Sequence, residues 1–164
     1  MDSDGYLSQL ADIFNGITVN TPSISAIIAI ALAGVLLLAS GFASASEIAF
    51  FSLSPSDRND IDERNHPSDD KISALLGDTE RLLATILITN NFVNVTIIML
   101  CNFFFMNVFV FHSPLAEFLI LTVILTFLLL LFGEIMPKIY SAQKTLAFCR
   151  FSAPGIYFLE KVFR

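Results

Sequence analysis

The sequence predicts an all-α membrane protein with three transmembrane helices. The chain has 164 residues, of which 55% are hydrophobic. A soluble domain of this size has too little interior to bury so much apolar surface, and the excess lies in three long apolar runs. Charged residues gather between the first two runs and after the third. We therefore expect a pair of short cytoplasmic helices between the first two spans and a C-terminal juxtamembrane amphipathic helical belt.

Composition and charge exclude several classes of function. The net charge of −6 argues against a nucleic-acid partner. The two cysteines, Cys101 and Cys149, lack metal-ligand spacing and are expected to be buried or lipid-facing thiols. No Lys or Arg precedes the first apolar run, so the N-terminus is not a secretory signal. We expect no enzymatic activity, and hence no catalytic or cofactor-binding residues.

Residues 1–22 are expected to form an extracytoplasmic N-terminal segment. They are polar and acidic, but apolar residues recur in them at helical spacing, which favours a short amphipathic helix on the membrane surface. These residues are Tyr6, Leu7, Leu10, Ile13 and Phe14.

The first span is expected over residues 23–53, with small and polar residues at 40–47. A hydrocarbon core of about 30 Å needs only about 20 helical residues, so this helix is tilted or projects beyond the lipid. The cytoplasmic loop at 54–81 is strongly charged. Two short helices fit in it, at 56–65 and 69–77, and a fully solvated loop is the alternative.

The second span is expected over residues 82–111, interrupted by five asparagines. A tight turn at 112–114 leads into the third span, over 115–143. The transmembrane domain therefore covers residues 23–143. Residues 144–164 mix aromatic and basic side chains and form the juxtamembrane amphipathic segment, in which Pro154-Gly155 is expected to break the helix.

The basic residues predict the orientation. All nine lie either in the loop at 54–81 or from Lys138 onward, at and after the end of the third span. Basic residues favour the cytoplasmic side, so the N-terminus is expected outside and the C-terminus in the cytoplasm. The chain is then a multi-pass protein of the cell (inner) membrane.

Polar side chains within the spans fall at one depth. Ser40 and Ser44 are four residues apart, as are Asn90 and Asn94, so each pair shares one helix face. Counted from the cytoplasmic helix ends, these residues and Glu134 lie 8 to 13 residues deep. An ionisable residue at such depth is a functional-site hypothesis by default. We expect the five side chains to converge between the three helices.

This set of ligands contains one carboxylate, two amides and two hydroxyls. Hard oxygens of this kind suit Mg²⁺, Ca²⁺ or Na⁺ rather than zinc or copper, and Mg²⁺ takes about six oxygens at about 2.1 Å. Pro137 has no N–H, so the Gly133 carbonyl one turn earlier loses its helical partner and becomes a sixth candidate. The predicted metal site consists of Ser40, Ser44, Asn90, Asn94, Gly133 and Glu134.

Structural roles are the alternative for each of these residues. Ser and Gly in membrane helices commonly mediate close packing, and Asn commonly bonds across helices. Glu134 has a further alternative, an ion pair with Lys138 four residues on.

Three sequence motifs resemble those of the CNNM/CorC magnesium transporters, whose membrane module is also called the DUF21 domain. They are SGFASASEIA at 40–49, the stretch from LLAT at 82–85 to NNFVN at 90–94, and FGEIMPK at 132–138. The motifs occur in the family's order, and the resemblance covers roughly residues 24–164. Thr89 departs from the glycine that usually precedes the asparagine, and Asn91 is an additional polar group.

The resemblance implies a homodimer in the lipid bilayer, with cytoplasmic CBS-pair and CorC-type domains C-terminal to this chain. It also implies a dehydrated Mg²⁺ held by the first-helix serines, Asn90 or Asn94, the Gly133 carbonyl and Glu134. The expected function is Mg²⁺ efflux, with Na⁺ as a candidate coupling ion. The alternatives are a non-transporting membrane anchor or accessory subunit, for instance in motility, and a Mg²⁺ sensor.

Overall fold

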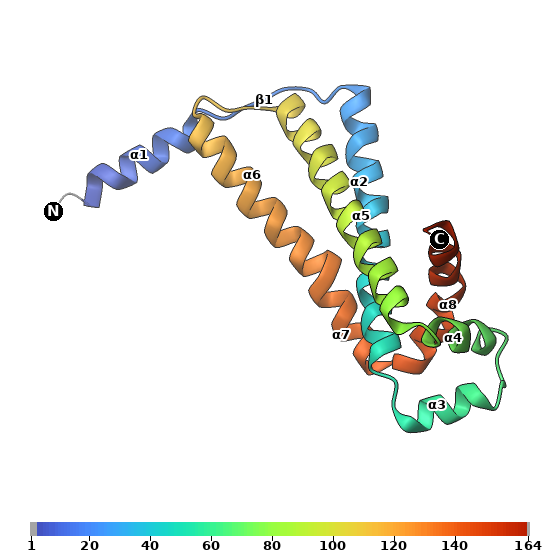
Figure 1. Ribbon diagram of the computed structural model, residues 1–164. Helices are drawn as coiled ribbons and strands as arrows, with labels where there is room; N and C mark the ends of the chain where they lie inside the picture. Colours follow the sequence, from blue (N-terminus) through green and yellow to red (C-terminus); the bar gives the residue numbers. More distant parts are fainter. Residues whose placement is uncertain (1–2, 164) are drawn as a thin grey trace.

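The computed structural model describes residues 3–163. Three helical stretches in it are long and apolar enough to cross a membrane, which confirms the predicted all-α membrane fold class. The first is α2 (Ile24–Phe51) and the second is α5 (Thr79–Val108). The third runs from Pro114 to Gln143 through α6 (Pro114–Leu128), η1 (Leu129–Ile135) and α7 (Met136–Gln143) (Figure 1).

Side-chain caps mark the starts of α2, α3, α5 and α6. The Ser23 side chain accepts the backbone N–H of Ala26 at the start of α2, and Asp78 and Ser113 do the same for α5 and α6. Ser54 forms a capping box with Asp57 at the start of α3 (Pro55–Asp62). Such caps satisfy N–H groups that have no partner within the helix.

Helices α2 and α5 lie side by side, whereas α6 leans away from them (Figure 1). The chain returns to α2 through η1 and α7, which contact α2 directly. An apolar cluster that includes Ala33, Val93 and Leu125 joins the three stretches. The third stretch therefore meets α2 at the level of η1.

Three shorter helices build a second core beside the end of α2 that carries Phe50. They are α3, α4 (Asp69–Leu76) and α8 (Thr145–Val162), and Ile72 and Ile156 are completely buried between them. The helix expected at 56–65 ends earlier, at Asp62, because Arg64 has a φ of 53°, which no right-handed helix accommodates. The helix expected at 69–77 ends one residue early, at Leu76.

The expectation that Pro154-Gly155 breaks the C-terminal segment is wrong, because α8 continues through both residues. Cys149, Ala153 and Ile156 are fully buried along one face of α8. A Cβ at Gly155 would lie 3.1 Å from the Phe42 ring. Close packing on α2 thus stabilises the helix enough to offset the hydrogen bond that the proline removes.

A short β-ladder at the other end of the molecule was not expected. Helix α5 ends at Val108, short of the predicted residue 111, and β2 (Phe109–Val110) pairs antiparallel with β1 (Thr18–Val19). The Asn20 N–H donates to the Val108 carbonyl at 2.7 Å, so the groups left free at the helix end find partners in the segment after α1 (Ser3–Asn15).

Candidate metal centre

Three oxygens meet where α2 packs against α5. The Ser40 Oγ lies 2.9 Å from the Asn90 Oδ1 and 2.6 Å from the Asn94 Oδ1. Ser40 is fully buried and Asn90 nearly so. A hydroxyl has a single hydrogen to donate, so it satisfies only one of the two amide oxygens at a time. At this contact two amide oxygens therefore share one hydroxyl hydrogen, which is an excess of acceptors at this point.

The third helical stretch reaches this cluster at Gly133. This residue is buried on η1, and a Cβ placed there would lie 3.2 Å from the Ser40 Oγ and 3.5 Å from Leu37. A methyl group there would be in tighter contact than is usual, so either the Ser40 side chain or η1 would have to shift. The glycine therefore lets the backbone of the third stretch approach the oxygens of the first two.

The backbone around Gly133 forms a π-helix, where the sequence indicated an uninterrupted α-helix. Residues Leu129–Ile135 adopt this wider turn, and the Met136 N–H donates to the Leu131 carbonyl, five residues back. Pro137 has no backbone N–H. It therefore cannot donate to the Gly133 carbonyl, the α-helical acceptor, or to the Phe132 carbonyl, the π-helical acceptor. Short π-helical turns of this kind occur frequently at functional sites.

Ser44 lies one turn after Ser40 on α2. It is fully buried, and its Oγ is the single buried side-chain polar atom in residues 3–163 that has no hydrogen-bond partner. A serine in a helix usually finds a partner in the carbonyl four residues back, as Ser46 does with Phe42 at 2.6 Å. Leaving a buried hydroxyl unpaired costs about 1–3 kcal/mol, which makes this atom a candidate ligand.

Glu134 follows Gly133 on η1 and is half-buried. Within the described residues, its carboxylate takes part in no hydrogen bond or salt bridge, so the structure does not link it to Ser40, Ser44 or the asparagines. The alternative pair with Lys138 does not form. The Lys138 ammonium lies 3.1 Å from the Glu47 carboxylate instead, which leaves the Glu134 charge without a cationic partner among residues 3–163.

Glu47 is a residue of this interface for which the sequence predicted no role. This residue ends the small-residue stretch of α2, three positions after Ser44, and its pair with Lys138 ties α2 to α7. Its position inside the SGFASASEIA motif was the available signal. The pairing itself joins residues far apart in the sequence and could not be read from helical spacing.

Small residues of α2 also allow close packing between helices, which was the predicted alternative to metal binding. A Cβ at Gly41 would lie 3.0 Å from the Pro137 ring. The Ser141 Oγ donates to the Ala45 carbonyl at 2.6 Å in the same interface between α2 and α7. Packing accounts for Gly41 and Ala45, but it leaves the acceptor excess at Ser40 and the unpaired Ser44 hydroxyl unexplained.

The chemistry of the cluster fits a small hard cation. Neighbouring oxygens around an octahedral Mg²⁺ with bonds of about 2.1 Å lie about 3.0 Å apart, close to the spacing of 2.9 and 2.6 Å at Ser40. A cation also resolves the shortage of hydrogens, because it attracts every oxygen lone pair at once. Residues 3–163 hold no cluster of three His, Cys, Asp or Glu side chains of the kind that binds zinc.

An oxygen-rich centre between three long apolar helices defines an integral membrane protein with a polar site inside its helical bundle. The model of the family described as the CNNM, or Cyclin M, transmembrane N-terminal domain matches residues 30–164, and the chain belongs to this family. The match includes α2 from Ile30 onward and everything after it, so it contains the whole cluster. No curated protein matches the chain.

Proposed function

We propose that this chain is the membrane module of a Mg²⁺ transporter. The observation that carries the proposal is the acceptor excess around Ser40, where two amide oxygens share one hydroxyl hydrogen. The unpaired Ser44 hydroxyl, one turn away, supports it. The proposed ligands are Ser40, Ser44, Asn90, Asn94, Gly133 through its carbonyl, and Glu134.

These groups would replace water around the ion. Mg²⁺ gives up its hydration shell reluctantly, so a site that strips it needs both a full set of oxygens and negative charge. Glu134 supplies that charge because no cation within residues 3–163 neutralises it. Family resemblance favours outward transport of Mg²⁺ with Na⁺ as the exchanged ion. The positions of the basic residues favour the inner membrane, with the N-terminus outside and the C-terminus in the cytoplasm.

A homodimer is part of the proposal. Asn91 is exposed on α5 next to the buried Asn90, within a helix that is long and apolar enough to cross the membrane. An amide facing lipid is costly, so polar residues in such helices usually face protein or water. A second copy of the chain would cover it. The resemblance carries the further expectation of cytoplasmic CBS-pair and CorC-type domains after the membrane module.

Glu134→Gln tests the metal centre. A ligand that binds only the folded state stabilises it by about 2.7 kcal/mol at 100 times its Kd, so Mg²⁺ should raise the Tm of the wild-type protein in detergent. We expect this rise to disappear in Glu134→Gln, because the substitution removes the one charge of the site while keeping its shape.

Glu117→Gln is the matched control, since Glu117 is also half-buried and lies at the opposite end of the same helical stretch. It should keep the full Mg²⁺ response. An undiminished response in Glu134→Gln would refute the assignment of the site.

A measurement of Mg²⁺ flux distinguishes a transporter from a membrane anchor and from a Mg²⁺ sensor. The hydrogen bonds from Ser40 to α5 and the packing of Gly41 on Pro137 are also what a non-transporting membrane anchor would need. In proteoliposomes, Mg²⁺ movement that Glu134→Gln abolishes supports the transporter. Mg²⁺ binding without flux would favour a sensor, and neither binding nor flux would favour the anchor.

A further inference from the structure

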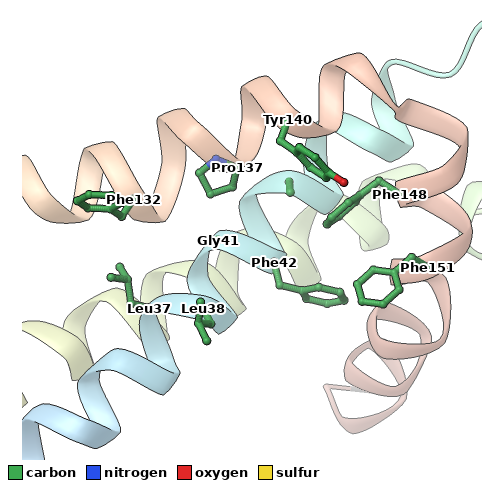
Figure 2. A pocket seen from close by; sticks show the side chains of 10 residues that line it. Leu37, Leu38, Gly41, Phe42, Phe132, Pro137, Tyr140, Phe148 and Phe151 are labelled. Carbon is green, nitrogen blue, oxygen red and sulfur yellow. The ribbon is translucent and has the colours of Figure 1, made fainter.

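A groove of about 440 Å³ opens between α2, the third helical stretch and α8. Figure 2 shows its walls: Leu38 and Phe42 from α2, Phe132 and Tyr140 from the third helical stretch, and Phe151 from α8. Its volume lies within the range of about 300–1,000 Å³ that is typical of ligand pockets. The groove is therefore large enough to hold part of a ligand.

The groove is almost entirely apolar. No charged side chain lines it, and Leu38, at 76% exposure, and Phe151, at 69%, face outward along its rim. Gly41 and Pro137 line the groove, whereas none of the oxygen-bearing residues of the Ser40 cluster does. A hydrated ion or polar solute gains nothing in such a place, whereas a hydrocarbon chain fits it.

A positive charge stands at the end of the groove formed by α8. A second depression, lined by Lys144 and Ala147, shares Tyr140, Phe148 and Phe151 with the groove and so continues it. Lys144 lies exposed at the turn between α7 and α8, directly before the N-terminus of α8, whose helix dipole is also positive there.

Lys144 also differs from its basic neighbours. Lys138 pairs with Glu47 and Arg150 with Asp69, but Lys144 has no carboxylate within 4.0 Å in residues 3–163. An uncompensated cation next to an apolar groove is complementary to a molecule with an anionic head and a hydrocarbon tail.

We propose that this surface binds one anionic phospholipid. Its acyl chain lies in the groove between Leu38, Phe42 and Phe132, and its phosphate lies against Lys144 at the start of α8. A second copy of the chain is the competing occupant, and the uncompensated charge of Lys144 favours an anionic lipid over it. The site does not depend on the metal centre.

Native mass spectrometry of the full chain in detergent tests the proposal, with phosphatidylglycerol and phosphatidylcholine of identical acyl chains as probes. One lysine near a membrane surface contributes about a fivefold preference for an anionic lipid, so phosphatidylglycerol should be retained about fivefold more strongly. Lys144→Gln should abolish this preference, whereas Lys71→Gln, which removes another exposed lysine with no salt bridge among residues 3–163, should keep it.

A second pair of variants tests the groove itself. Phe151→Ala should reduce retention of both lipids, and Phe158→Ala should not, because Phe158 is similarly exposed on the same helix (66%) but lies outside the groove. Phe151 also packs edge-on against the rings of Phe42 and Phe148, so Phe151→Ala should lower the Tm slightly, and lipid retention is compared well below the Tm of both variants.

Three results would overturn the proposal. The first is an unchanged preference for phosphatidylglycerol in Lys144→Gln. The second is equal lipid loss in Phe151→Ala and Phe158→Ala. The third is the absence of bound lipid together with a shift in the monomer–dimer balance on mutation of Phe151, which would assign the groove to a second copy.

Discussion

Two buried polar clusters of this protein differ in how completely their hydrogen bonds are made. The Asp69 carboxylate is fully buried, and it receives the Arg150 Nε at 2.9 Å, the Arg150 Nη2 at 3.0 Å and the His66 N–H at 3.0 Å. The Ser40 hydroxyl, in contrast, faces two amide oxygens with one hydrogen. The first cluster is complete in itself, whereas the second provides one hydroxyl hydrogen for two amide oxygens.

The electrostatics of Asp69 agree with a structural role. Burial alone would raise the pKa of its carboxyl group, but the hydrogen bonds from Arg150 and from the His66 backbone outweigh burial, and the pKa is lowered. The carboxylate is thus held in its charged form by the groups that surround it. Because it joins α4 to α8, we interpret it as a brace of the second core rather than as a binding group.

The largest expected effect comes from breaking that brace. Arg150→Leu leaves the Asp69 charge buried without its partner, which costs 3–5 kcal/mol for a fully buried pair. Arg150 is partly exposed, so we expect the free energy of unfolding to fall by about 2–3 kcal/mol. Urea unfolding in detergent measures it. The Mg²⁺-dependent rise in Tm should persist, and its loss would contradict the division of roles between the two clusters.

A smaller effect is expected at Ser40. Ser40→Ala removes the donor from two amide oxygens and should lower the free energy of unfolding by about 1–2 kcal/mol without Mg²⁺, while abolishing the Mg²⁺ response. Ser46→Ala is matched to it, because Ser46 is equally buried on α2 but bonds only its own helix. Thermal unfolding with and without Mg²⁺ compares the two. The assignment fails should both variants respond to Mg²⁺ alike.

The smallest effect on stability is expected at Ser44, and it is the sharpest test of an incomplete site. Its hydroxyl has no partner among residues 3–163, so Ser44→Ala removes no hydrogen bond and should leave the free energy of unfolding within about 0.5 kcal/mol of wild type, or raise it. Titration with Mg²⁺ should nevertheless show weaker binding. A marked loss of stability without Mg²⁺ would mean that Ser44 has a packing role.

Local signals were enough to predict the helices of this fold. The apolar runs predicted the three spans. The i, i+4 spacing of Asn90 and Asn94 placed both amides on the face that meets Ser40. What a single helix determines by itself was therefore accessible from sequence.

Features that depend on two distant segments were not accessible. The π-helix at Gly133 occurs where η1 lies close to Ser40 on α2. The salt bridge between Glu47 and Lys138 joins α2 to α7. Pro154 continues α8 because that helix packs against α2. In each case tertiary contacts override the local preference, and only the arrangement of the helices reveals it.

The β-ladder has a mechanical consequence for the proposed transport cycle. It ties the residues before α2 to the end of α5 through backbone bonds, and the Ser23 N–H adds a bond to the Asn107 side chain at 3.4 Å. Separating α2 from α5 at this end breaks that ladder, whereas at the end near α7 it disturbs side-chain contacts. We therefore expect α2 and α5 to pivot about the β-ladder. Their opposite ends should separate, on the side where Lys138 and Lys144 lie.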